Sequence, residues 1–304
     1  MRLRLVASAL LAATVALVPT RSSAWSFDVH RFITDHAIDL LPDGLKPFYQ
    51  KYRSFIVEHT VDPDLWRTAG WLDEPPHHFM DLDVYGPPPF SALPRDYDRA
   101  VERWGKEFVD KNGQLAWRTA EIYGQLQRAF EGQKKHTPYA YENVKFYSAV
   151  IAHYVGDGHV PFHAVANYDG QLSGQTGIHS RFEAELAGRD LPTLTLTPAP
   201  AQPVSDPRNY MFDVLVDSFP SADRVLKADA LAVQGRDVYD DEYFRILDRE
   251  TRPILERQLS RAITGVASMI YGAWDAAGRP ELPVDPPRTI KKVAAGARPV
   301  DSKP

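Results

Sequence analysis

Cysteine is absent from all 304 residues of this sequence. The chain therefore forms no disulfide, uses no thiol nucleophile and cannot carry a lipid on an N-terminal cysteine. Two other patterns are also missing, the Gly-x-Ser-x-Gly elbow of serine hydrolases and the Gly-x-Gly-x-x-Gly phosphate loop. A hydrophobic core must hold the fold together unaided, or metal ions must help it.

Long apolar runs are also lacking, except for one near the N-terminus. Residues 5–17 are apolar apart from Ser8 and Thr14, and Arg2 and Arg4 precede them. The run is short for a bilayer span, and the small residues that end at Ala24 fit a cleavage site. We therefore predict a signal peptide over residues 1–24 and a secreted or periplasmic protein; the alternative is an uncleaved membrane anchor. Cleavage would leave Trp25 with a free α-amine.

Excess positive charge is a further absence. The formal net charge is −5, and removal of Arg2, Arg4 and Arg21 with the first 24 residues would change it to −8. Such a balance argues against a broad basic surface for duplex nucleic acid, although a small cationic pocket stays possible. No motif indicates an obligate protein partner.

Helical periodicity dominates what is present, and no convincing strand pair occurs. We predict an all-α fold, a single multi-helical domain over residues 25–282, followed by a disordered Pro- and Lys-rich tail over 283–304. Proline- and aspartate-rich residues 59–96 and Pro- and Thr-rich residues 190–206 are expected to be loops. The predicted helices cover residues 27–41, 45–57, 97–130, 142–160, 175–186, 207–233 and 240–277.

The richest segment for chemistry is His-Tyr-Val-Gly-Asp-Gly-His-Val-Pro-Phe-His, which begins at His153. His153 and Asp157 are four residues apart, so on a helix they share one face and can bind the same ion. Pro161 is expected to end or kink the helix and so to turn His163 toward a neighbouring ion. His179 and Glu183 repeat the four-residue gap downstream. Imidazole with carboxylate favours zinc over calcium or magnesium.

A second group of candidate ligands lies earlier in the chain. It comprises His30, the pair His77-His78 and the spaced aspartates Asp62 and Asp64. Doubled histidines and spaced aspartates in a loop can also be solvated turn residues, so this group is ambiguous on its own.

These motifs together make the sequence resemble the superfamily of zinc-dependent phospholipases C and single-strand-specific zinc nucleases. The shared pattern is His-Tyr-x-Gly-Asp-x-His-x-Pro-x-His from His153, with His-Phe-x-Asp-x-Asp from His78, and the resemblance runs from Trp25 to about residue 280. It implies an all-α fold with three zinc ions in a cleft. By resemblance, the implied ligands of the first ion are Asp64, His78, His153 and Asp157. Those of the second are Trp25 (α-amine and carbonyl), His30 and the bridging Asp157, and those of the third are His163, His179 and Glu183.

The resemblance also implies a reaction, the hydrolysis of a phosphodiester by a zinc-bound hydroxide. Asp64 is the candidate for orienting or deprotonating the nucleophile. Asp64 is preferred to Asp62 as the ligand because its distance to His78 fits better and because Asp-Leu-Trp-Arg, from Asp64, looks like a nuclease pattern. Asp28 and Phe79 are candidate substrate-binding residues.

The substrate is less defined, because the sequence mixes two branches of the superfamily. Glu183 and the Asn that follows His163 look like the phospholipase C branch, whereas the gap from Trp25 to His30 looks like the nucleases. We favour a phospholipase C-like enzyme whose substrate is a phospholipid head group, with peripheral membrane contact. The alternatives are a single-strand-specific endonuclease, with single-stranded nucleic acid as substrate, and a non-catalytic zinc-binding envelope protein.

Overall fold

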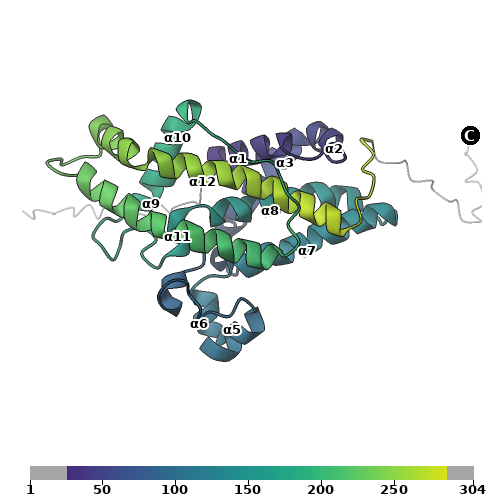
Figure 1. The fold of residues 1–304 in the computed structure, drawn as a ribbon, viewed down its shortest axis with the longest axis horizontal. Helices are drawn as coiled ribbons and strands as arrows, with labels where there is room; N and C mark the ends of the chain where they lie inside the picture. The colour runs from purple at the N-terminus through teal and green to yellow at the C-terminus, as the bar shows by residue number, and fades with distance from the viewer. Residues whose placement is uncertain (1–25, 286–304) are drawn as a thin grey trace, which may run out of the picture.

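Four long helices form the centre of the protein in the computed structural model, which describes residues 26–285. They are α7 (Leu115–Lys134), α8 (Ala140–Gly158), α11 (Pro207–Ala232) and α12 (Asp241–Ala276). Figure 1 shows α11 and α12 side by side, and both contact α7 and α8. No strand occurs within residues 26–285. The prediction of an all-α, single-domain fold is confirmed.

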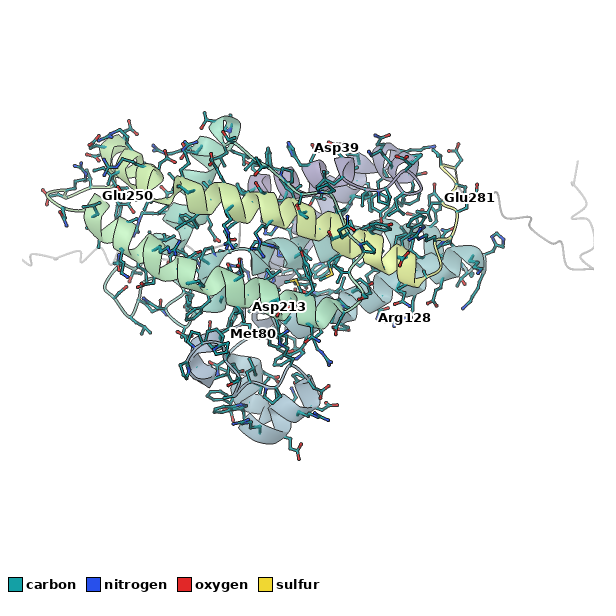
Figure 2. The ribbon with its side chains drawn as sticks, viewed as in Figure 1. Asp39, Met80, Arg128, Asp213, Glu250 and Glu281 are labelled. Carbon is teal, nitrogen blue, oxygen red and sulfur yellow. The ribbon has the colours of Figure 1, made fainter. Side chains whose placement is uncertain are left out.

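Helix α8 lies at the centre of this arrangement. Every residue of α8 from Ser148 to Gly158 is buried, as expected for a helix segment that lies in the core. It packs most extensively on α7 and also contacts α12 and α1 (Phe27–Asp39). Figure 2 shows side chains filling the space between these helices. The polar residues that α8 carries, His153 and Asp157, are therefore withdrawn from solvent.

The single helix predicted over residues 97–130 is wrong. The segment forms three helices, α5 (Tyr97–Trp104), α6 (Lys106–Lys111) and α7. Gly105 and Gly113 separate them with φ angles of +83° and +94°, which only glycine adopts without strain. As a result α5 and α6 project from one side of the molecule (Figure 1). The helix predicted over 45–57 is likewise divided at Tyr52 into α2 (Lys46–Lys51) and α3 (Arg53–Glu58).

The long loop predicted over residues 59–96 also needs correction, because much of it is helical. It contains η1 (His59–Val61), α4 (Asp62–Thr68), η2 (Pro75–His78) and η3 (Leu82–Tyr85). The prolines had indicated loop, but Pro63 and Pro75 lie in the first turns of α4 and η2. Proline is well accommodated there, since a first-turn N–H has no intrahelical partner.

The helix predicted over 175–186 begins at Ile178 and continues without a break to Asp190, with a π-helical middle. It comprises α9 (Ile178–Ser180), the π-helical η5 (Arg181–Leu186) and α10 (Ala187–Asp190), followed by η6 (Leu191–Thr193). The loop predicted after residue 190 follows α12 closely; the backbone N–H groups of Thr197 and Gln202 donate to Ser260 and Ser268.

The two predicted terminal segments are only partly covered. The signal peptide over residues 1–24 and Trp25 lie outside the described residues, as does the tail from residue 286. The described chain does continue past residue 282, where the Tyr141 hydroxyl donates to the carbonyls of Pro283 and Val284. None of the helices within residues 26–285 is both long and apolar enough to cross a bilayer.

Candidate metal centre

His153 and Asp157 occupy successive turns of α8 and point the same way. Nε2 of His153 lies 3.3 Å from Oδ2 of Asp157, and both side chains are fully buried. The four-residue spacing had indicated this shared face. Three further segments converge on the pair, and each brings one or more of the candidate ligands.

The first group joins α4 and η2 to α8. Asp64, His78 and His153 each offer one ligand atom, and these atoms lie within 4.8 Å of one another. Nδ1 of His78 is 3.1 Å from Nε2 of His153 and 3.8 Å from Oδ1 of Asp64. Nδ1 of His78 also lies 3.0 Å from Oδ2 of Asp157. Asp62 points elsewhere and accepts a hydrogen bond from His59.

The second group is formed by α1 and α8. His30, His153 and Asp157 bring their ligand atoms within 4.8 Å. Nε2 of His30 lies 3.3 Å from Oδ1 of Asp157, and the His30 ring stacks on that of His153 with centroids 4.1 Å apart. Trp25, the other ligand expected here, lies outside the described residues.

The third group is formed by η4 (Pro161–Ala164), α9 and η5, and comprises His163, His179 and Glu183. Nε2 of His179 lies 2.9 Å from Oε2 of Glu183, and Nε2 of His163 lies 3.9 Å from the same oxygen. The His163 Nδ1 is 3.8 Å from Oδ1 of Asp157. Asp157 therefore contacts members of all three groups.

Backbone hydrogen bonds hold the segments around α8 in register. The N–H of Met80, two residues after His78, donates to the carbonyl of His163, which ties the first group to the third. The N–H of Ala166 donates to the Asp83 carboxylate, the last acid of the His-Phe-x-Asp-x-Asp pattern. Gly113 permits the close approach of α7, because a Cβ there would lie 2.1 Å from the carbonyl oxygen of Phe79.

Several potential ligand atoms in these groups have no hydrogen-bond partner within the groups, and a bound cation would give them one. The Nδ1 atoms of His30, His153 and His163 are buried without a hydrogen-bond partner in the described part of the chain. Buried polar atoms without partners are rare in folded proteins unless an ion or water satisfies them. Three buried groups of His, Asp and Glu could therefore hold metal ions.

The protonation of His163 and His179 suits this role, whereas His78 would have to release a proton on binding a cation. Burial lowers the pKa of His163 to about 3 and that of His179 to about 4, so both rings are neutral at pH 7, as metal ligands must be. Burial also lowers the pKa of His78, but contacts with Asp157 and Glu74 outweigh it and raise the value to about 9. The pKa of Asp157 is held well below its usual value against the effect of burial, chiefly by His153.

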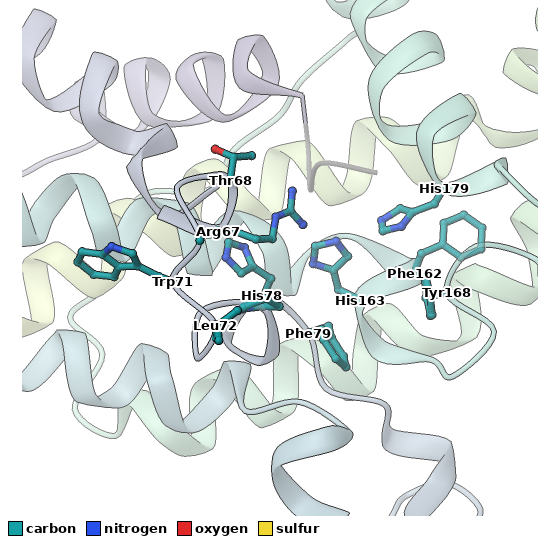
Figure 3. A pocket seen from close by; sticks show the side chains of 12 residues that line it. Arg67, Thr68, Trp71, Leu72, His78, Phe79, Phe162, His163, Tyr168 and His179 are labelled. Carbon is teal, nitrogen blue, oxygen red and sulfur yellow. The ribbon is translucent and has the colours of Figure 1, made fainter. Parts of the chain in front are cut away.

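The first and third groups border one cavity of about 770 Å³. His78, His163 and His179 line it, together with Phe79. Figure 3 shows Trp71 and Leu72 on the His78 side of this cavity and Phe162 and Tyr168 on the His179 side. Asp28 is not among the lining residues. Its exposed carboxylate instead lies 3.7 Å from Nη1 of Arg31.

Some residues of the cavity were not among the predicted site residues. Nη2 of Arg67 lies 3.2 Å from Oδ1 of Asp64, one turn earlier on α4, and places a fixed positive charge in the cavity. The three-residue spacing from Asp64 could have indicated this. Trp71 and Leu72 had no comparable signal, because they follow α4 in a turn without periodicity.

Comparison with known proteins adds nothing to this geometry. No protein-family model matches the sequence, and no curated protein is detectably similar to it.

Asp64→Asn is expected to lower zinc content by about one equivalent, whereas Asp62→Asn is expected to leave it unchanged. Asp64 faces His78 and His153, but Asp62 faces His59. Zinc per chain is measured by atomic emission after dialysis at pH 7.5. Equal losses in the two variants, or a loss only in Asp62→Asn, would contradict this assignment.

Asp81 is expected to make folding stability fall as pH rises from about 4 to about 7. Burial, aided by Asp83, raises its pKa to about 7. The native state then keeps a proton that the unfolded chain releases above its own pKa of 3.8. The stabilisation is fully present below pH 4 and is lost through pH 7, by up to about 1.4 kcal/mol per pH unit.

The measurement is urea unfolding of chelator-treated wild type and Asp81→Asn at several pH values. Asn carries no titrating proton, so the stability of wild type relative to the variant should decline between pH 4 and 7. A constant difference across this range would rule out the raised pKa.

Proposed function

We propose that this protein is a zinc-dependent phosphodiester hydrolase of the phospholipase C type. The observation that carries the proposal is the meeting of three buried His, Asp and Glu groups around Asp157, two of which border one cavity. The proposed ligands are Asp64, His78, His153 and Asp157 for one zinc; Trp25, His30 and Asp157 for a second; and His163, His179 and Glu183 for a third.

When bound, zinc ions would supply Lewis acidity that activates water and neutralises phosphoryl oxygens. The chain's own residues add orientation and charge. Asp64 contacts two residues that line the cavity, Arg67 and His78, and can orient the attacking water or accept its proton. The Arg67 guanidinium, 3.2 Å from Asp64, can pair with a non-bridging phosphoryl oxygen and hold the Asp64 carboxylate in place. The reaction then needs no covalent intermediate on the protein.

The substrate proposal rests on the rim of the cavity. Trp71 is 59% exposed and Leu72 is 89% exposed on one side. Tyr168 is 48% exposed on the other side, and Leu172, in the same loop, is 74% exposed. Apolar side chains at the mouth of a phosphodiester-cleaving cavity suit a substrate whose acyl chains continue beyond the ester. This favours a phospholipid, with the protein in peripheral contact with a membrane.

A second candidate, the single-strand-specific nuclease, is favoured by the position of Trp71. Its ring stacks on Trp66 with centroids 5.3 Å apart and leaves one face exposed at the cavity. An exposed aromatic face beside a cation is a platform for an unpaired base.

Turnover by the zinc-loaded mature protein decides between these candidates. Phosphatidylcholine vesicles and single-stranded DNA are offered in parallel, each with and without a chelator. We expect release of phosphocholine that the chelator abolishes. Release of nucleotides alone would support the nuclease, and bound zinc without turnover of either substrate would support a non-catalytic zinc-binding envelope protein.

Export is part of the proposal, because the α-amine of Trp25 is free only after residues 1–24 are removed. A form with extra residues before Trp25 is expected to lose one zinc equivalent and most activity. Zinc content and turnover are measured before and after a protease removes the extension. Full activity of the extended form would contradict the role of the α-amine.

A further inference from the structure

Glu74 is a buried carboxylate next to the first group of candidate ligands. It lies one residue before η2 and is 2% exposed. The sequence offered no reason to select it, since it belongs to neither of the two histidine motifs. Its carboxylate lies 3.3 Å from Nδ1 of His77 and 3.4 Å from Nε2 of His78, and it accepts a hydrogen bond from Tyr154. A buried anion beside a candidate ligand calls for a functional account.

The two ring nitrogens of His78 face different partners. Nδ1 points into the group, 3.0 Å from Asp157 and 3.1 Å from His153. Nε2 points the other way and lies 3.4 Å from Oε1 of Glu74. With a cation held by Asp157 and His153, Nδ1 would carry no proton, and the Glu74 carboxylate is the nearest acceptor for the proton then left on Nε2.

Tyr154 fixes the carboxylate in turn. Its hydroxyl donates a 2.5 Å hydrogen bond to the same oxygen, Oε1 of Glu74, from a fully buried ring on α8. Arg118 of α7 approaches this hydroxyl with Nε at 3.5 Å, and its guanidinium lies over the ring. Tyr154 is the Tyr of the His-Tyr-x-Gly-Asp pattern, a position for which metal binding by itself gave no role.

We propose that Glu74, held by Tyr154, is a positioning residue that orients His78 and selects the tautomer in which Nδ1 can bind a metal ion. The inference rests on the proposed metal centre and adds two residues that hold one of its ligands in place. Carboxylates in such a position commonly change metal affinity by about 10- to 100-fold.

The test measures zinc affinity rather than turnover. Mature protein with Glu74→Gln is titrated against a chromophoric zinc chelator at pH 7.5, and Co²⁺ absorption reports the ligand geometry. We expect one zinc equivalent to bind about 10- to 100-fold more weakly and the other equivalents to be unchanged. Glu58→Gln, the same change at an exposed residue paired with Arg31, is the matched control and should bind as wild type does.

A double-mutant cycle separates positioning from general structural support. In a His78→Ala background, Glu74→Gln should cause no further loss of zinc affinity, because the ring it positions is gone. Tyr154→Phe keeps the ring and Glu74 but removes the hydrogen bond. It should weaken the same equivalent by roughly fivefold, and it serves as the test if Glu74→Gln does not fold.

The outcomes separate the two proposals. Unchanged zinc binding by Glu74→Gln, equal weakening of every equivalent, or an undiminished effect in the His78→Ala background would overturn the positioning role and leave the metal centre intact. A wild-type protein that binds no zinc would overturn the metal centre and this inference with it.

Discussion

Asp157→Asn is expected to have the largest effect of any single substitution in this protein. The Asp157 carboxylate contacts His30, His78 and His153 and lies 3.8 Å from Nδ1 of His163. Loss of its charge should release at least two zinc equivalents and lower turnover to the background of chelated enzyme. Removal of one partner from a buried charged group commonly costs about 3–5 kcal/mol, so the variant should unfold at a much lower urea concentration than zinc-loaded wild type. Zinc content, turnover and urea unfolding check the three parts.

Asp229→Asn is the matched control for this substitution. Asp229 is as buried as Asp157 but contacts Arg181, Tyr243 and Gln175 rather than the ligand groups. This variant should also lose stability, yet keep the zinc content of wild type. Zinc loss of the same size in both variants would show that general destabilisation, not ligand removal, explains the result.

Removal of zinc by a chelator is expected to lower the melting temperature of the wild-type protein by more than about 10 °C. The three groups hold buried carboxylates and imidazoles close together, and bound cations would stabilise the folded state by binding their ligand atoms. A site filled at a hundredfold excess over its Kd contributes about 2.7 kcal/mol. In a domain of this size each kcal/mol moves the melting temperature by about 2–4 °C.

Differential scanning calorimetry measures this change, and metal re-addition supplies its control. Zinc should restore the melting temperature, whereas magnesium should not, because imidazole-rich sites favour zinc. If the melting temperature does not change in protein shown to have lost its metal, then bound cations do not stabilise the fold.

Local spacing made part of the site predictable. His153 with Asp157, and His179 with Glu183, are four residues apart, and helical geometry places such pairs on one face whatever surrounds them. Pro161 could be expected to interrupt α8 before His163 for equally local reasons. The long helices of the core followed from periodicity in the same way, since burial of one apolar stripe requires it.

Proline and glycine were harder to interpret. Proline favours both loops and the first turn of a helix, so residues 59–96 were assigned to a loop although α4 and η2 carry Asp64 and His78. Gly105 and Gly113 divide a segment whose apolar periodicity continues across them, and only the φ values that packing imposes reveal the breaks. Asp28 was expected at the substrate, yet its helix turns it to solvent beside Arg31.

The sequence by itself determined the helical class, the core helices and the pairs His153–Asp157 and His179–Glu183, because these depend on residue type and on spacing within one element. The other candidate ligands were implied by the resemblance. Only the tertiary structure decided which ligands meet and that Arg67 and Trp71 line the same cavity. It also decided that Glu74 contacts His78 and accepts a hydrogen bond from Tyr154. The physical reason is that these contacts join α1, α4, η2, η4 and η5 to α8. The distance between side chains on separate elements is set by how the whole core packs, and no local pattern encodes it.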